Sequence, residues 1–486
     1  MYSVSMAVVG ERLYERVAGR VKDQILKRTY RPGDRLPSVR ELSRAYKVSI
    51  TTVLDAYRLL EDQGYIHPRP QSGHYVRSRP NQIIAEPDRT RPKFEPAEFR
   101  REVLMDQIMH DAHRPGVVSL ALATPGPHLR PEGKLNRVAN QILRDFPSDA
   151  YNYTEINGYQ PLREQIAQRL FEAGCSVSPD DVVITNGCQE ALVLALNVVC
   201  RPGGVVAVES PCYYGVLATT RMVGLKAVEI ETRSREGMCI DRLEEALATA
   251  YGTDGQIQAV LISTNFGNPL GGQLSDVDKQ RLVQVCQRYE ATIIEDDVYG
   301  ELGFDDSRPS VAKAYDDSDN VLLCSSFSKT LAPGLRVGWV VSGKYRTKIE
   351  RAKHVTTIST ASLPQLIVAE FLSNGGYDHY LRKARKAYAA NMQQMSDAIV
   401  RHFPEGTRMT RPVGGFVLWV ELPPEVNTIA LYGKTVEEGV TFTPGILFSA
   451  HDQYRNFMRL AASVWDNRTE QAVALIGQMA KSMRMP

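Results

Sequence analysis

The sequence predicts a small three-helix module with a β-hairpin, joined by a linker to a large α/β body. Apolar residues at helical spacing recur through residues 11–62, and two short strand patterns follow them. From about residue 116, short runs rich in Val, Ile and Leu alternate with longer helical patterns, which is typical of a parallel sheet with crossover helices. A chain of 486 residues is long enough for about three folding units.

Charge separates the same two parts. The whole chain has a formal net charge of +2, but residues 1–80 contain 15 Lys and Arg against 8 Asp and Glu, and the other 406 residues carry −5. A basic module joined to a near-neutral body favours a polyanion as the module's partner. On charge alone, an ordinary solvated face remains open as the alternative.

Composition indicates a cytoplasmic protein. No run of about 18 apolar residues appears, and the first residues lack the pattern of a secretory signal, so we expect neither a membrane span nor export. The seven cysteines are scattered without a close pair, which favours reduced thiols and gives no metal-binding spacing. We therefore expect no membrane partner and no metal.

The module begins with a helix predicted over residues 11–28. Its apolar side chains recur at steps of four, as expected of a helix that buries one stripe. These side chains are Leu13, Val17, Val21 and Ile25. The turn at residues 31–34 ends this helix.

Two further helices each begin at a capping residue. Ser38 followed by Glu41 forms a capping box, and Ser49 caps the third helix. The third helix is predicted to bury Val53, Tyr57 and Leu60. Short strands at residues 65–67 and 74–77 complete a winged helix-turn-helix, whose third helix would enter the major groove of double-stranded DNA.

Hydroxyl and guanidinium groups surround the predicted recognition helix, where they can contact bases and phosphates. The candidate DNA contacts are Arg35, Arg40, Ser49, Thr51, Thr52 and Arg69. The stretch from Arg31 to Val76 resembles the DNA-binding domain of the GntR family of bacterial regulators. A helical adaptor that does not bind DNA is the alternative.

Ile50 departs from the pattern of that family, which usually has a long polar or basic residue directly after the cap. The side chain could extend the buried stripe, since it lies three residues before Val53, or it could touch a thymine methyl group. The sequence leaves both interpretations open.

In the body, five apolar runs end in polar residues. The runs are residues 182–185, 205–210, 260–264, 292–295 and 321–326. Open α/β sheets bind ligands beyond the carboxyl ends of their strands, so these ends are expected to form one pocket. Each ending alone is weak evidence, because such residues are usually structural.

The most specific segment is SFSKTLAPGLRVGW, residues 326–339. With the strand endings, it resembles the class I and II aminotransferases, whose fold is the pyridoxal 5′-phosphate fold type I, across about residues 116–480. The resemblance implies pyridoxal 5′-phosphate as the cofactor, held as a Schiff base on the catalytic Lys329. Arg336, Ser326 and Ser328 would hold the cofactor phosphate.

The resemblance assigns further cofactor contacts. The turn at Gly187 and Cys188 would offer backbone amides to the phosphate at a helix N-terminus. Tyr213 resembles the residue that stacks on the pyridine ring, and Asp296 resembles the carboxylate that keeps the ring nitrogen protonated, with a simple helix cap as its alternative. The phenolic oxygen of the ring would bind Asn268 and Tyr299. Leu270 replaces the usual Thr of the motif that begins at this asparagine.

Three other positions concern the effector and a second subunit. Arg459 lies in an apolar strand and resembles the arginine that pairs with a substrate carboxylate, with a structural salt bridge as the alternative. Gly126 resembles a glycine of the substrate loop. Tyr153 resembles the tyrosine that reaches the phosphate of the neighbouring subunit, which implies a homodimer.

These resemblances divide the chain into four parts: a DNA-binding domain at 1–78, a Pro-rich linker at 79–115, a large aminotransferase-like domain at 116–360 and a small C-terminal α+β domain at 361–486. This is the arrangement of the MocR subgroup of GntR regulators. It implies a regulator that binds the cofactor and senses a small amino compound or the cofactor itself. A working aminotransferase with an appended module, and a DNA-binding protein whose body is only a dimerisation scaffold, are the alternatives.

Overall fold

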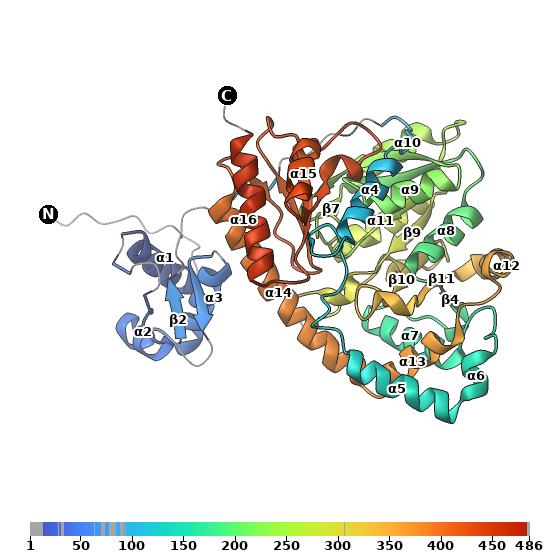
Figure 1. The fold of residues 1–486 in the computed structure, drawn as a ribbon, viewed down its shortest axis with the longest axis horizontal. Coiled ribbons are helices and arrows are strands. Elements are labelled where there is room, and N and C mark those ends of the chain that lie inside the picture. Colours follow the sequence, from blue (N-terminus) through green and yellow to red (C-terminus); the bar gives the residue numbers. More distant parts are fainter. Residues whose placement is uncertain are drawn as a thin grey trace. The chain divides into compact units, whose positions relative to one another are not determined.

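The computed structural model describes residues 13–27, 29–30, 34–62, 64–69, 73–76, 84–87, 92, 94–305 and 307–483. The chain forms two compact units that divide after residue 84 (Figure 1). Each unit is described by itself. Among the described residues, no helix combines the length and the apolar character needed to cross a membrane.

The first unit is the predicted three-helix module with a hairpin. Its elements are α1 (Leu13–Leu26), α2 (Val39–Tyr46), α3 (Ile50–Asp62), β1 (Ile66–Arg69) and β2 (Gly73–Val76). Val17, Val21 and Ile25 are buried as predicted, whereas Leu13, at the end of α1, is 50% exposed. The capping box of Ser38 and Glu41 is present.

The hairpin is tied to the helices. The β2 strand pairs with the segment before α2, because the Leu36 amide donates to the His74 carbonyl at 2.8 Å and the Val76 amide donates to the Asp34 carbonyl at 2.9 Å. The Tyr57 hydroxyl, on α3, donates to the Pro37 carbonyl at 2.6 Å. These bonds fix the hairpin beside the third helix, as a winged helix-turn-helix requires.

An eight-stranded sheet forms the centre of the body, in the order β4-β11-β10-β9-β8-β5-β6-β7. Its strands are β4 (Val182–Thr185), β5 (Val205–Ser210), β6 (Lys226–Arg233), β7 (Gly237–Met238), β8 (Ile257–Ile262), β9 (Thr292–Asp296), β10 (Val321–Ser326) and β11 (Gly338–Val341). The neighbours from β10 to β6 are parallel, whereas β11 and β7 run antiparallel to their neighbours. This sheet with its helices is the predicted fold type I body.

Helices cover both faces of the sheet. Val205 and Ala207 pack in one apolar cluster with α10 (Ile240–Ala250) and α11 (Asp276–Arg288). The intervening Val206 and Val208 are also fully buried, and they point to the other face because strand side chains alternate. The other helices of the large domain are α5 (Glu132–Asp145), α6 (Pro147–Tyr151), α7 (Gln160–Glu172), α8 (Cys188–Val199), α9 (Tyr214–Met222) and α12 (Arg346–Thr357).

A second, four-stranded sheet lies in the C-terminal part, in the order β12-β13-β16-β15. It consists of β12 (Arg408–Met409), β13 (Val417–Glu421), β15 (Thr443–Pro444) and β16 (Phe457–Ala461). The helices of this part are α14 (Gly376–His402), α15 (Thr428–Glu437) and α16 (Asn467–Ser482). Figure 1 shows the long α14 leading from the region of α5 and α13 (Ser362–Ser373) to α16.

The structure differs from the predicted domain boundaries in two places. Within residues 79–115, which the proline content predicts as a linker, α4 (Glu102–Ala112) packs on the C-terminal part, and Ala97 pairs with Ala227 of β6. An extended proline-containing segment has few internal hydrogen bonds, so its free backbone groups pair with the body. The short strands β3 (Val118–Ser119) and β14 (Val440–Thr441) join the two ends of the body in the same way.

The second difference concerns α13 (Ser362–Ser373), which begins the predicted small domain. Its apolar residues from Leu366 to Leu372 belong to the same buried cluster as Leu135 of α5 and Leu162 of α7. The helix therefore completes the core of the large domain. Its apolar face, rather than its place in the sequence, decides which domain it joins.

Candidate functional site

Lys329 lies in the loop after β10, and its Nζ donates to the Ala123 carbonyl at 2.6 Å. Burial, together with the charges of Arg459 and Arg336, lowers the pKa of this amine to about 8, whereas the charge of Asp296 opposes the shift. These four ionisable groups, which are far apart in the sequence, therefore lie within electrostatic reach of one another. A neutral amine is well populated near pH 8, which is the state that a nucleophilic lysine requires.

Asp296 ends β9 and is 8% exposed. Its Oδ1 accepts hydrogen bonds from the Val298 amide at 3.3 Å and from the Cys188 thiol at 3.6 Å. Burial raises the pKa of Asp296 to about 6, and the hydrogen bonds and the Lys329 charge limit the rise. The carboxyl group is thus mostly ionised above pH 7 and can hold a proton on a basic nitrogen placed against it.

Among the described residues, several predicted site atoms are buried without a hydrogen-bond partner: Asn268 Oδ1, Tyr299 Oη, Arg459 Nε and Arg459 Nη1. Tyr299 lies within electrostatic reach of Asp296 and of Arg459, and Arg459 also lies within reach of Lys329. Buried polar groups are nearly always paired, so a cluster of unpaired ones indicates a place for a polar ligand.

Arg459 is 1% exposed on β16. Its Nη2 donates to the Ala121 carbonyl and, at 2.7 Å, to Thr443 Oγ1. Across the described part of the chain no carboxylate forms an ion pair with this guanidinium, so the structural salt bridge weighed as an alternative is not observed. A buried guanidinium of this kind can accept a carboxylate ligand.

An anion cradle forms where β4 leads into α8. Helix α8 begins at Cys188, with Gly187 as its N-cap and no side-chain cap. Arg336 donates from Nη2 to the Asn186 carbonyl at 2.7 Å and from Nη1 to Ser328 Oγ at 3.3 Å. An open helix N-terminus beside a guanidinium and a hydroxyl suits a phosphate group.

Ser326 supports this cradle from the end of β10, since its Oγ accepts the Ser328 amide at 2.9 Å. At Gly187, φ is 81°, and a Cβ there would lie 2.5 Å from Arg336 Nη2. Only glycine leaves room for that guanidinium at this distance.

The remaining predicted residues line the site or lie away from it. Tyr213 caps α9, and burial, followed by the nearby Tyr214 and Tyr299, raises its pKa well above the usual range. At Gly126, a Cβ would lie 2.6 Å from the Ser463 carbonyl oxygen, so no side chain fits there. Tyr153 is 81% exposed and is not brought to the site within one chain.

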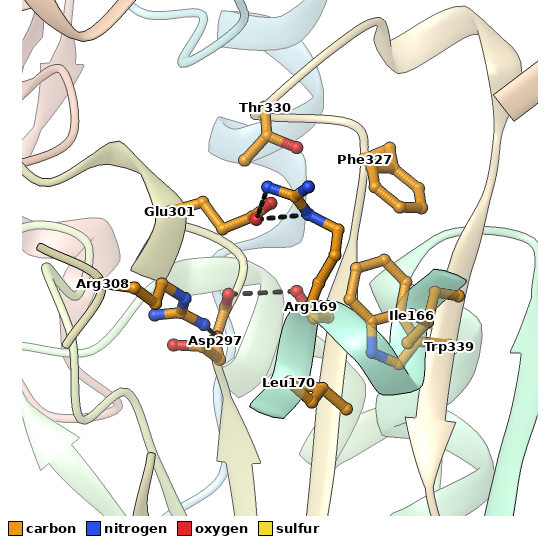
Figure 2. A pocket seen from close by; sticks show the side chains of 10 residues that line it. Ile166, Arg169, Leu170, Asp297, Glu301, Arg308, Phe327, Thr330 and Trp339 are labelled. Carbon is orange, nitrogen blue, oxygen red and sulfur yellow. Dashed lines mark hydrogen bonds and ion pairs between the residues drawn. The ribbon is translucent and has the colours of Figure 1, made fainter. Parts of the chain in front are cut away.

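A layer of buried ion pairs behind the lysine loop is absent from the sequence-based predictions. Figure 2 shows a small cavity with Phe327 and Thr330, which flank Ser328 and Lys329, on its wall. Arg169 pairs with Glu301 at 2.7 Å, and Arg308 pairs with Asp297, the neighbour of Asp296. These partners are separated by 132 and 11 residues, so helical or strand periodicity carries no signal of the pairing.

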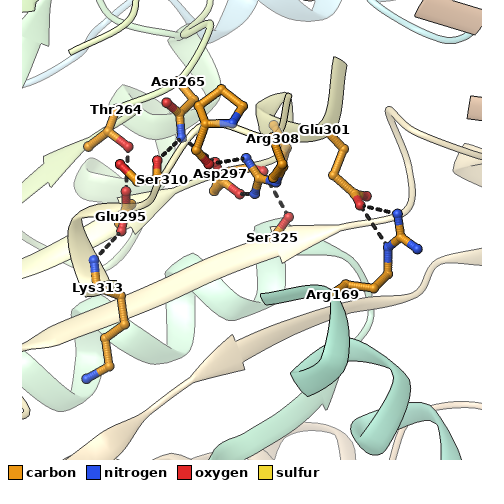
Figure 3. Close-up of polar contacts among 12 residues, drawn as sticks. Arg169, Thr264, Asn265, Glu295, Asp297, Glu301, Arg308, Ser310, Lys313 and Ser325 are labelled. Carbon is orange, nitrogen blue, oxygen red and sulfur yellow. Dashed lines mark hydrogen bonds and ion pairs between the residues drawn. The ribbon is translucent and has the colours of Figure 1, made fainter. Parts of the chain in front are cut away.

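The same layer extends under β9 (Figure 3). Glu295 accepts the amides of Ala312 and Lys313 at 2.7 and 3.0 Å. Asn265 donates from Nδ2 to Asp297 Oδ1 at 3.1 Å and accepts Lys279 Nζ at 3.0 Å. These contacts hold the end of β9, and with it Asp296, in a fixed position.

The predicted DNA contacts lie around the start of α3. Ser49 Oγ accepts the Thr52 amide at 3.1 Å and lies 2.8 Å from the hydroxyls of both Thr51 and Thr52. Arg35 and Arg40 are exposed. The backbone of Arg69 belongs to β1, but its side chain lies outside the described part of the structure.

Ile50 is 49% exposed, whereas Val53 is fully buried. The interpretation of Ile50 as part of the buried stripe is therefore wrong. The first turn of α3 instead presents this side chain outward, next to the hydroxyl cluster of Ser49.

The two units match two families. Residues 13–76 match the family of bacterial regulatory proteins of the gntR type, and residues 130–476 match the class I and II aminotransferases. The chain belongs to the GntR-type regulators with an aminotransferase body. It is 37% identical over 472 residues to the uncharacterized HTH-type transcriptional regulator YjiR of Escherichia coli (strain K12), covering 96% of this chain and 98% of that protein. This two-part arrangement is that of the MocR subgroup.

Solved structures resemble the body of this regulator. A kynurenine aminotransferase of Pyrococcus horikoshii in complex with PMP has a TM-score of 0.74 at 28% identity, covering 80% of this chain and 98% of that one. LysN, the α-aminoadipate aminotransferase of Thermus thermophilus, complexed with N-(5′-phosphopyridoxyl)-L-leucine, has a TM-score of 0.71 at 31% identity, covering 78% and 94%.

The residues of this chain fit the cofactor of the family. A partly neutral lysine amine, an ionised carboxyl group, an open anion cradle and unpaired buried polar atoms are the groups that a phosphorylated pyridine aldehyde needs. Pyridoxal 5′-phosphate is therefore the cofactor of this body. Across the described residues, no group of His, Cys, Asp and Glu side chains could hold a metal ion.

Proposed function

We propose that this GntR-type regulator changes its affinity for DNA when an amino compound, or pyridoxal 5′-phosphate itself, occupies the site of its body. The observation that carries the proposal is the pair of buried residues with unpaired polar atoms, Tyr299 and Arg459, within electrostatic reach of Asp296 and Lys329 respectively, in a chain that also carries a winged helix-turn-helix. Such a response requires that the ligand bind two states of the protein unequally, typically by ~1–3 kcal/mol.

In this proposal, each residue of the site has a defined task. Lys329 would hold the cofactor through its ε-amine, and the lowered pKa would supply the neutral amine that this requires. Asp296 holds the ring nitrogen in its protonated state, and Asn268 and Tyr299 bind the phenolic oxygen. When bound, the cofactor supplies an electron-withdrawing ring to an attached amine.

The anion cradle holds the cofactor phosphate. Arg336 contributes its guanidinium, Ser326 and Ser328 contribute hydroxyls, and the turn at Gly187 and Cys188 contributes amides at the positive end of α8. Tyr213 stacks on the ring.

Arg459 defines the chemistry of the effector. Its two unpaired nitrogens are buried, so a ligand with a carboxylate would satisfy them without further loss of hydration. Gly126, assigned to the substrate loop by the resemblance, lies against the Ser463 carbonyl, so a side chain at this position would have to displace that backbone. The effector is therefore an amino compound that carries a carboxylate, such as an α-amino acid.

A homodimer completes the site in this proposal. Two neighbouring segments, residues 151–153 and 355–358, expose large apolar side chains. These are Tyr151 (78%), Tyr153 (81%), Val355 (84%) and Ile358 (50%). Hydrogen bonds hold the two segments together, from Lys353 Nζ to the Ile156 carbonyl and, at 3.4 Å, from Thr154 Oγ1 to the Thr360 carbonyl. A second copy would cover this patch and bring its own Tyr153 to the phosphate.

The winged helix supplies the DNA contacts of the proposal. Arg35, Arg40 and Arg69 neutralise backbone phosphates, while Ser49, Thr51 and Thr52 present hydroxyls at the start of the recognition helix. Two such modules in a dimer would bind two half-sites. DNA binding and buried free thiols support a cytoplasmic location.

A working aminotransferase is the second candidate. It is favoured by the presence of Lys329, Asp296 and Arg459 in one site, which is the set that transamination uses. Turnover of an amino donor at the enzyme median of ~10 per second would favour this candidate. The DNA-binding module favours the regulator, because catalysis gives no use for it.

The deciding experiment combines absorption with DNA binding. Purified protein given pyridoxal 5′-phosphate should develop the visible band of the lysine-bound cofactor, and Lys329→Ala should abolish it. DNA affinity for the region upstream of the protein's own gene should then differ between wild-type protein with and without cofactor. A wild-type protein that stays colourless with cofactor, or whose DNA affinity is the same with and without cofactor, contradicts the proposal.

A further inference from the structure

The loop of residues 448–454 contacts the candidate site directly. The Arg459 guanidinium carbon lies 5.9 Å from the centroid of the Phe448 ring. The Phe448 carbonyl accepts the amide of Cys212, the residue before Tyr213, at 2.8 Å. A displacement of Arg459 or of the segment at Tyr213 would therefore displace Phe448 at the start of this loop.

A buried carboxylate joins the same loop to the sheet. Glu229, on β6, is fully buried and accepts Ser449 Oγ at 2.8 Å and the Ala450 amide at 2.5 Å. It also accepts Ser210 Oγ, at the end of β5, at 2.6 Å. Ser210 lies three residues before Tyr213, so one carboxylate holds both the loop and the strand end that leads to the cofactor ring.

On its other side, the loop holds the segment that enters the body from the DNA-binding module. Arg101 donates from Nη1 to the Ser449 carbonyl at 2.8 Å, and from Nη2 to the His451 carbonyl at 2.9 Å and to Asp452 Oδ1 at 2.7 Å. Ser449 is the shared residue, because its hydroxyl binds Glu229 and its carbonyl binds Arg101. The path from the ring-stacking segment to residue 101 is thus a continuous chain of hydrogen bonds.

A second set of contacts fixes the same entering segment to α9, the helix that Tyr213 caps. Arg221 of α9 donates to the Phe99 carbonyl at 2.5 Å and pairs with Glu102 at 2.7 Å. The Tyr214 hydroxyl contacts Met109 Sδ at 3.8 Å. The entering segment is therefore fastened to the two elements that flank the proposed ring site.

We propose that Glu229 and Arg101 are positioning residues that couple occupancy of the cofactor site to the segment leading to the DNA-binding module. The inference rests on the proposed function and names its route. In this route, a carboxylate bound to Arg459 shifts Phe448, and a ring bound against Tyr213 shifts Cys212. Ser449 moves with Phe448. Arg101, which binds Ser449, passes the displacement to residues 97–102. Coupling of this kind needs an element with two arrangements that both sites bias, and the proposal assigns this role to the 448–454 loop.

The test measures the dissociation constant of the full-length protein for its own upstream DNA, with and without pyridoxal 5′-phosphate. The ratio of the two constants should be between about 5 and 150 for wild type. Arg101→Ala and the milder Arg101→Lys should bring this ratio toward 1, while the visible band and the cofactor dissociation constant stay within about twofold of wild type. Glu229→Gln, which keeps the shape of the side chain but removes its charge, should also lower the ratio.

Arg100→Ala is the matched control. Arg100 is adjacent in sequence, its side chain is 76% exposed, and it pairs with the neighbouring Glu98 at 3.4 Å. This variant should keep the wild-type ratio.

The outcomes separate the inference from the function on which it rests. A wild-type ratio of 1 rejects the proposed function, and the inference with it. If the wild-type ratio differs from 1, and Arg101→Lys and Glu229→Gln have the same ratio as wild type, the inference alone is overturned. If Arg101→Ala does not fold, the two conservative variants decide.

Discussion

The Cys188 thiol lies 3.6 Å from Asp296 Oδ1, so the first residue of α8 donates a hydrogen bond to the carboxyl group at the end of β9. Cys188 begins the helix whose N-terminus forms part of the anion cradle, and Asp296 is the residue proposed to hold the ring nitrogen. One side chain therefore links the part of the site that holds the phosphate to the part that sets the charge of the ring.

This contact predicts that Cys188→Ala raises the pKa of Asp296, since the thiol hydrogen bond lowers it. Cofactor affinity should fall several-fold near pH 6, where ionisation of the carboxyl group becomes incomplete, and should change little at about pH 8.5. Titration of the visible band with cofactor at both pH values measures the effect. Cys188→Ser keeps a donor and should follow wild type; equal losses at both pH values would point to packing instead.

Asp296→Asn should stabilise the cofactor-free protein and weaken cofactor binding. The folded-state pKa of Asp296 is raised to about 6, against ~3.9 for an unfolded chain. Ionisation thus favours the unfolded state, and stability is lost as pH rises from about 4 through about 6. The amide, which cannot ionise, should gain about 1–3 kcal/mol near pH 8. Thermal unfolding without cofactor at about pH 4 and pH 8 checks this, since the difference should vanish at the lower pH.

Gly187→Ala should reduce cofactor affinity by at least about tenfold, because the new methyl group would displace the Arg336 guanidinium. Equilibrium dialysis with pyridoxal 5′-phosphate gives the measurement. Gly203→Ala is the matched control, since Gly203 has a similar φ of 77° but no atom within 4 Å of its Cβ position. If both variants bind the cofactor equally well, the clash with Arg336 does not control cofactor binding, and the prediction is wrong.

Local patterns in the sequence predict the module well. The capping box of Ser38 and Glu41 and the buried stripe of α3 depend on residues three or four apart, and both are present. The sequence also predicts that the strand ends lie together, because parallel strands align their carboxyl ends. Lys329 and Asp296 lie near each other for this reason.

Pairings between distant segments could not be predicted. Glu229 accepts hydrogen bonds from Ser210 and Ser449, which are 19 and 220 residues away, and only the folded sheet brings them together. The predicted end of the linker at residue 115 was wrong for a related reason. Ala97 pairs with Ala227 through backbone groups, which any residue could supply. Tyr153 cannot be placed from one chain, since its proposed contact lies in a second copy.

Ile50→Ala should weaken DNA binding several-fold without unfolding the module. Ile50 is 49% exposed, so its truncation should change the free energy of unfolding by no more than about 0.5 kcal/mol. Val53→Ala, at a fully buried position one turn later, should instead cost about 1–3 kcal/mol. Chemical denaturation separates the two variants, and DNA titration without denaturant measures the contact. Replacing thymine by uracil in the duplex removes the methyl group and should reproduce the loss in wild type, but not add to it in Ile50→Ala. Unchanged affinity in that variant would leave base reading to the hydroxyls of Ser49, Thr51 and Thr52.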